Sequence, residues 1–185
     1  MADWKELRSQ RSQVKAKRLA LVCLPVVAII TLFAFVLPDK PPRESNLIQN
    51  FHTHQAAFER LRDMLMADQQ VVYVASWGVE TTNSGIAKIP PEGDFPSSRY
   101  SEYLALLKQT SCTRAFRIKD KNLDLVGVNV WVHGWYGDTR HINICWTAQK
   151  PTNQVGSLDN YYQTKKPRRP VFRQIDGNWY LWADW

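Results

Sequence analysis

The chain has 185 residues, of which 44% are hydrophobic and 12% aromatic, and its formal net charge at pH 7 is +7. Residues 1–37 carry six Lys/Arg against two Asp/Glu, so more than half of the positive excess lies there. The rest of the chain is close to balanced, which argues against nucleic-acid binding and for an ordinary solvated surface.

The N-terminal part predicts a membrane anchor. Residues 19–37 contain no charged side chain, and as a helix they would span about 28 Å, close to the hydrocarbon thickness of a bilayer. The basic residues of segment 1–18 precede this run and favour a cytoplasmic N-terminus. We therefore expect a single-pass protein of a bacterial inner membrane: a basic cytoplasmic tail (1–18), a transmembrane helix (19–37), a spacer (38–44) and a periplasmic domain (45–185).

Three alternatives to the anchor fit the sequence less well. A cleaved signal peptide has a shorter apolar core and small residues at its cleavage site, whereas bulky residues close this run at Leu37. A lipoprotein would need a small residue before Cys23, where Val22 stands. A buried helix of a soluble protein is disfavoured by the basic flank and by Pro38, which ends the run.

Helical periodicity follows the spacer. Residues recur at spacings of three and four along one stripe: Leu47, Phe51, His54, Phe58, Leu61 and Leu65. Such spacing predicts one amphipathic helix with a packing face toward a sheet. A second helix is expected over 99–109, where Tyr100, Tyr103, Leu104 and Leu107 share its inner side.

The remaining periodic segments predict strands. They are rich in β-branched and aromatic residues and cover 71–77, 115–119, 123–133, 141–147, 171–175 and 178–183. Asp176 and Gly177 between the last two indicate a tight hairpin. Segments 78–98 and 148–170 are expected to be long loops. The fold class predicted is α+β, with two helices packed on one antiparallel sheet.

A candidate binding face follows from strand alternation. In segment 123–133, Val126, Val128, Val130 and Val132 fall on one side and predict the core. The other side, continued on the next strand, carries the candidate residues Asn129, Trp131, His133, Trp135, His141 and Asn143. Aromatic rings beside hydrogen-bonding groups are typical of protein interfaces, and tryptophans also stack on sugars. A half-exposed sheet face without function has the same pattern.

Cys112 and Cys145 are the two cysteines of the predicted periplasmic domain, and an oxidising compartment would allow a disulfide between them. Cys23 lies inside the predicted membrane span. Neither Cys112 nor Cys145 belongs to a CxxC motif. Across a hairpin, His133 and His141 would converge with Cys145 nearby, but two histidines and one cysteine are too few for a zinc site, so no metal and no cofactor is expected. Phosphate-binding, hydrolase and zinc-protease motifs are missing from the sequence, so we expect no enzymatic activity.

Three short segments carry a resemblance. FERLRDMLMAD at 58–68, RYSEYLALL at 99–107 and NWYLW at 178–182 resemble a group of small bacterial exported proteins, known as lipoproteins or single-pass membrane proteins of uncharacterised function. The resemblance implies an envelope location and an α+β domain, and it brings no catalytic residues.

Taken together, these features predict a membrane-anchored, non-enzymatic periplasmic domain that binds another protein. Nucleic acid and small-molecule ligands are not expected. One alternative is an immunity-type protein that neutralises a toxin acting in the envelope. A second is a cell-wall glycan-binding module that uses Trp131 and Trp135.

Overall fold

The computed structural model describes residues 40–120, 123–134, 139–162 and 170–184. Contacts divide the chain into two compact units, Met1–Lys40 and Pro41–Trp185, and every element below belongs to the second. The predicted transmembrane segment 19–37 lies outside the described residues. Within the described residues, no helix is long and apolar enough to cross a membrane.

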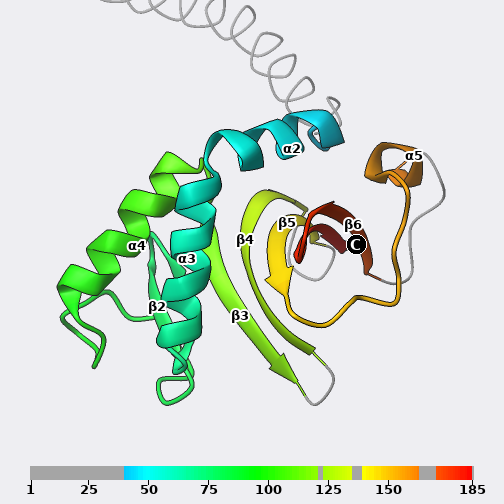
Figure 1. The fold of residues 1–185 in the computed structure, drawn as a ribbon. Helices are drawn as coiled ribbons and strands as arrows, with labels where there is room; N and C mark the ends of the chain where they lie inside the picture. The colour runs from blue at the N-terminus through cyan, green and yellow to red at the C-terminus, as the bar shows by residue number, and fades with distance from the viewer. Residues whose placement is uncertain (1–39, 121–122, 135–138, 163–169, 185) are drawn as a thin grey trace, which may run out of the picture. The chain divides into compact units, whose positions relative to one another are not determined.

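Seven strands form one antiparallel sheet in the order β2-β1-β3-β4-β5-β7-β6. The strands are β1 (Val71–Ala75), β2 (Gly78–Thr81), β3 (Arg114–Asp120), β4 (Leu123–His133), β5 (Arg140–Thr147), β6 (Val171–Asp176) and β7 (Trp179–Asp184). Gly177, with φ of 51°, turns the chain between β6 and β7 at the predicted hairpin. β7 lies between β5 and β6 in the strand order, so the last hairpin, drawn in red in Figure 1, extends the sheet on the β5 side.

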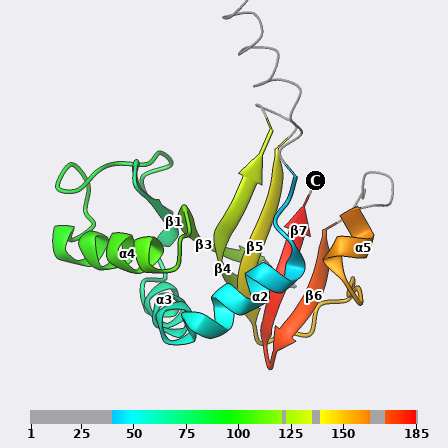
Figure 2. The ribbon, with the colours of Figure 1, turned by 90° about the horizontal axis from the view of Figure 1, so that it is seen from above.

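The described helices are α2 (Glu44–Thr53), α3 (Gln55–Ala67), α4 (Ser97–Gln109) and the short α5 (Leu158–Tyr162). The α+β class is therefore confirmed, but the first predicted helix is two helices. His54, with φ −119° and ψ 25°, leaves the helical region and separates α2 from α3. Figure 2 shows α4, α3 and α2 following one another across the sheet from β1 toward β6.

The helices cover one face of the sheet and make the main core with it. α3 packs on β3 and β4, α4 packs on β1 and β3, and the Phe51 ring of α2 lies 5.2 Å from the Trp179 ring of β7. Val126 and Val128 point into this core as predicted. Because the apolar stripes of α2 and α3 are buried here, the periodicity of segment 47–65 is explained by packing.

The opposite face of the sheet carries a smaller cluster. Its buried members are Phe116, Leu125, Cys145, Phe172 and Tyr180, with Tyr73, Ile118, Leu123 and Trp182 packed against them. Register places these residues on the face away from α3, since Phe116, Gly127, Cys145 and Tyr180 lie opposite one another in a row across four strands. Among the described elements, none of α2, α3 and α4 lies on this face. It is named the open face below.

One strand was missed within the predicted loop 78–98. β2 pairs with β1 in a short hairpin, and Val79 bridges to Lys88 on the other side. Gly78 adopts φ 137°, and a Cβ on it would lie 2.8 Å from the Lys88 carbonyl oxygen. The loop therefore folds back tightly on the sheet edge at a glycine, a contact that composition alone does not reveal.

Candidate functional site

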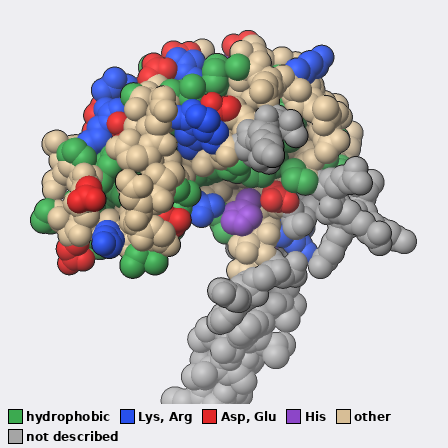
Figure 3. All heavy atoms as spheres, turned by 90° about the horizontal axis from the view of Figure 1, so that it is seen from below, with side chains coloured by type: hydrophobic (Ala, Val, Ile, Leu, Met, Phe, Trp, Pro, Cys, Tyr) green, Lys and Arg blue, Asp and Glu red, His purple; other side chains and the backbone are tan. Residues whose placement is uncertain are grey.

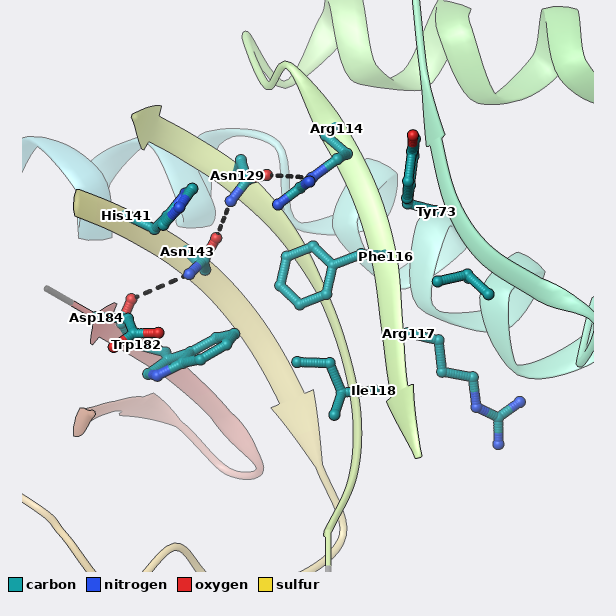
Figure 4. Close-up of a pocket in the computed structure, with 11 residues that line it drawn as sticks. Tyr73, Arg114, Phe116, Arg117, Ile118, Asn129, His141, Asn143, Trp182 and Asp184 are labelled. Carbon is teal, nitrogen blue, oxygen red and sulfur yellow. Dashed lines mark hydrogen bonds between the residues drawn. The ribbon is translucent and has the colours of Figure 1, made fainter. Parts of the chain in front are cut away.

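A pocket of about 280 Å³ opens on the open face of the sheet (Figure 4). Its walls come from β1, β3, β4, β5 and β7, and the lining residues are Val72, Tyr73, Arg114, Phe116, Arg117, Ile118, Asn129, His141, Asn143, Trp182 and Asp184. Figure 3, the view from below, shows a hollow in which a histidine lies beside basic and acidic side chains. The pocket therefore combines flat aromatic walls with charged and hydrogen-bonding groups.

Gly127 forms part of the sheet beneath this cluster. A Cβ at this position would lie 2.9 Å from Cζ of Phe116 and 3.1 Å from Cβ of Cys145. These distances are shorter than ordinary van der Waals contact, so the ring of Phe116 can lie across β4 only because position 127 has no side chain. The glycine thus sets how the aromatic wall of the pocket is placed.

A chain of hydrogen bonds runs across four strands in the pocket, from β3 through β4 and β5 to β7 (Figure 4). Arg114 Nε donates to Asn129 Oδ1 at 2.6 Å, and Asn129 Nδ2 donates to Asn143 Oδ1. Asn143 Nδ2 then points to the Trp182 carbonyl oxygen at 3.5 Å. Both amides are almost fully buried. Each therefore needs its partners, and the chain holds Arg114 in one orientation.

Arg114 is a partly buried cation among aromatic rings. Its guanidinium carbon lies 5.5 Å from the Tyr73 ring centroid and 5.7 Å from that of Phe116. Burial lowers the pKa of Arg114, while Tyr73 and Glu80 raise it. Within the described part of the chain, no carboxylate makes an ion pair with Arg114, and Nε is its only nitrogen in a hydrogen bond. The two terminal nitrogens therefore remain available as donors.

Two polar atoms of pocket residues are buried and have no hydrogen-bond partner among the described residues: Nδ1 of His141 and Nε1 of Trp182. Burial lowers the pKa of His141, as does the nearby charge of Arg114, whereas Asp184 raises it. The imidazole is therefore neutral at pH 7. Buried polar groups in proteins are nearly always hydrogen-bonded, so these two atoms are exceptions within the described residues.

A β-bulge divides the predicted binding face between the two sides of the sheet. Asn129 pairs with Asn143, but the register shifts after it, and Trp131 pairs with Ile142 and His133 with Arg140. Trp131 therefore packs against the main core, and its ring stacks on that of His133 at 5.7 Å.

Of the six candidate residues, the structure brings Asn129, His141 and Asn143 together in the pocket. Trp131 and His133 lie on the other side of the sheet, so the prediction of a single face containing all of them is wrong. Val132 was predicted in the core, but it pairs with His141 and is 43% exposed. Trp135 lies outside the described residues.

The predicted disulfide is not formed. Cys112 and Cys145 are both free and buried. Cys112 belongs to the core under the helices and Cys145 to the cluster on the open face, so the β-layer separates them. Burial raises the pKa of Cys112 to about 12, although the Thr110 carbonyl, its hydrogen-bond partner, lowers it. Burial also raises the pKa of Cys145 well above its ordinary value.

The structure adds site residues that sequence reasoning missed: Tyr73, Arg114, Phe116, Trp182 and Asp184. Alternation in β3 and β7 was a usable signal for most of them, because Arg114, Phe116 and Ile118 share one side of β3. The sequence does not show which side of each strand the helices cover. Among the described residues, no three His, Cys, Asp or Glu side chains are grouped to hold a metal ion.

Comparison of the chain with protein-family models, curated proteins and solved structures finds no match. The function is therefore inferred from the chemistry of the pocket and from the sequence pattern alone.

Proposed function

We propose that this chain is a membrane-anchored, non-enzymatic protein whose periplasmic domain binds another protein through the open face of its sheet. The observation that carries this proposal is the pocket. In it, an arginine that makes no ion pair within the described residues lies between aromatic walls. Aromatic residues and arginine are the side chains most enriched at the energetic centres of protein interfaces.

The chemistry of the pocket favours binding over catalysis. Cys145 lies on the same side of the sheet as His141 but has no exposed surface, and its raised pKa keeps it a thiol. A nucleophile needs an exposed thiolate or a base within hydrogen-bond reach. The glycan alternative loses its basis in Trp131, which packs against the core rather than lining the pocket.

The proposed location rests on the charge-free run 19–37 and the basic residues before it. A reporter fused after residue 185 tests it. We expect alkaline phosphatase, which folds only outside the cytoplasm, to be active there and green fluorescent protein, exported in the same way, to be dark. The reverse pattern would overturn the proposed topology.

The proposed binding face is tested by photo-crosslinking from the full chain in the organism that encodes it. A photoreactive phenylalanine analogue at Val132 stands next to the pocket, because Val132 pairs with His141 and is 43% exposed. The same analogue at Ala105, an exposed position on α4, is the matched control on the helical side.

We expect Val132 to give a discrete protein adduct that Ala105 does not give. Mass spectrometry of the adduct identifies the partner, and a secreted toxin there would specify the immunity-type form of the proposal. No adduct from Val132, or the same adduct from both positions, would overturn the open face as the binding surface.

A further inference from the structure

The two arginines of β3 differ in where they point and in how their charge is compensated. Figure 4 shows Arg117 pointing away from the other residues of the pocket, and its Nη1 donates to the Leu65 carbonyl of α3 on the helical side of the sheet. Arg117 also makes two hydrogen bonds to the Asp124 carboxylate, at 3.1 and 2.9 Å, and its side chain is only 6% exposed. Within the described residues Arg114 makes no ion pair, although the charge of Glu80 raises its pKa, and only its Nε is hydrogen-bonded. Arg114 therefore supplies the pocket with a cation that no carboxylate of the described residues pairs.

The unsatisfied groups of the pocket have the chemistry of an anion site. The terminal nitrogens of Arg114 can only donate hydrogen bonds, and they have no acceptor within the described residues. Burying unpaired donors and a cation costs free energy that an acceptor-rich anion would recover.

The charges around the pocket favour a ligand that carries a single negative charge. Glu80 pairs with Tyr73 across β1 and β2, and Asp184 pairs with His141 across β5 and β7, so a carboxylate stands toward each end of the pocket. With Arg117 already paired, a dianion such as a phosphate monoester would meet one free cation and two acids. A planar carboxylate matches the two free nitrogens of one guanidinium.

The walls and size of the pocket define what carries the carboxylate. The rings of Tyr73, Phe116 and Trp182 line it, and its volume is about 280 Å³. The pocket is therefore slightly smaller than the sites that bind drug-sized ligands, which measure roughly 300–1,000 Å³. A space of this size holds one flat apolar group together with a carboxylate, which is about as much as one amino-acid side chain and the residue next to it.

We propose that the pocket receives a carboxylate, attached to or beside a flat apolar group, from an extended segment of the partner protein, and that Arg114 binds it. This inference rests on the proposed function. The Nη atoms of Arg114 donate to the two carboxylate oxygens, and the aromatic rings enclose the apolar group.

Titration calorimetry of the purified full chain tests the chemistry with two probes of almost equal shape. Phenylacetate carries the carboxylate, and phenylacetamide is its neutral isostere. We expect phenylacetate to bind at least tenfold more tightly. Equal affinity for the two probes, or no binding of phenylacetate, would overturn the inference. This comparison needs no substitution, so it does not depend on how a variant folds.

Substitutions then assign the binding to Arg114. We expect Arg114→Gln to weaken phenylacetate binding at least tenfold and to leave phenylacetamide unchanged. Arg60→Gln is the matched control, because Arg60 is a 54%-exposed arginine on α3, paired with Glu102. It should alter neither affinity by more than twofold. Unchanged phenylacetate binding in Arg114→Gln would overturn the role of Arg114.

Competition separates this inference from the proposed function. Saturating phenylacetate should suppress the adduct formed from Val132, and phenylacetamide at the same concentration should not. If the adduct forms but the chain does not bind phenylacetate, the carboxylate inference fails while the proposed function stands. If phenylacetate binds but the adduct still forms at full strength, or if phenylacetate binds and no adduct forms at all, the natural ligand of the pocket is a free small acid. Either result excludes a segment of a partner protein as the occupant.

Discussion

Asn129 and Asn143 lie directly opposite each other on β4 and β5, and Asn129 Nδ2 donates a hydrogen bond to Asn143 Oδ1. Oδ1 of Asn129 accepts a hydrogen bond from Nε of Arg114. The only free cation that lines the pocket, within the described residues, is thus positioned by a pair of buried amides rather than by a carboxylate. Because the amides carry no charge, they orient Arg114 without neutralising it, which leaves the guanidinium ready for an anionic partner.

The asparagine pair should contribute to stability. Replacing Asn143 by Ala leaves the Nδ2 group of Asn129 buried without its acceptor, and we expect the free energy of unfolding to fall by about 1–3 kcal/mol. Asn160→Ala, at an exposed position of α5, is the control and should change it by less than about 0.5 kcal/mol. Urea unfolding measures both. Equal stability of the two variants would show that the pair is not energetically coupled to the fold.

Gly127 should not tolerate even a methyl group. In Gly127→Ala the new Cβ would meet Phe116 at 2.9 Å and Cys145 at 3.1 Å, so the ring or the strands must shift. We expect a loss of about 1–3 kcal/mol in the free energy of unfolding, together with weaker phenylacetate binding because Phe116 lines the pocket. Gly156→Ala is the matched control, because nothing lies within 4 Å of the Cβ that it adds. It should leave both the free energy of unfolding and the affinity for phenylacetate unchanged. A stable Gly127→Ala protein with normal binding contradicts the role given to this glycine.

His141 should make stability depend on pH in one direction. Its pKa in the folded protein is lowered by burial and by Arg114, so between that value and the unfolded pKa near 6.5 the unfolded state holds more protons. Stability contributed by the neutral imidazole is therefore present above the unfolded pKa and is lost as pH falls toward the folded one.

His141→Gln removes this contribution. The wild type should lose stability more steeply than the variant when urea unfolding is compared between pH 7 and pH 5. Carboxylates such as Asp184 titrate in both proteins and largely cancel in the comparison. Parallel pH profiles would show that His141 has the same pKa in the folded and unfolded states. A steeper loss of stability in the variant would mean that folding raises the pKa of His141 rather than lowering it.

Cys112 and Cys145 should behave as buried thiols. With 8% and 0% exposure, neither should react with a maleimide in the native protein at pH 7, with or without prior reduction. Both should react in urea without reductant, as peptide mapping by mass spectrometry would show. Failure of both to react in unfolded, unreduced protein would mean that they are bonded after all.

Much of the sheet could be predicted from the sequence. The spacing of two between Val126 and Val128, and the turn at Gly177, located β4 and the last hairpin because burial of one sheet face imposes a period of two. The helix break at His54 could not be predicted, because the apolar stripe continues through it.

Half of the candidate site was missed for a similar reason. The bulge after Asn129 adds one residue to β4, so every later side chain changes sides, and Trp131 goes to the core while Val132 faces the pocket. No composition signal marks this bulge. Arg114 was not recognised because its importance lies in the absence of an acidic partner, which is a property of the assembled sheet and not of β3 alone.

The central claim is that Arg114 on the open face holds the partner, and crosslinking from Val132 in two variant backgrounds tests it most directly. With the full chain in its own organism, we expect the Val132 adduct to be as strong in Arg60→Gln as in wild type and to fall at least tenfold in Arg114→Gln, with equal amounts of folded protein. An adduct of undiminished intensity in Arg114→Gln, or no adduct in the wild type, would contradict the claim.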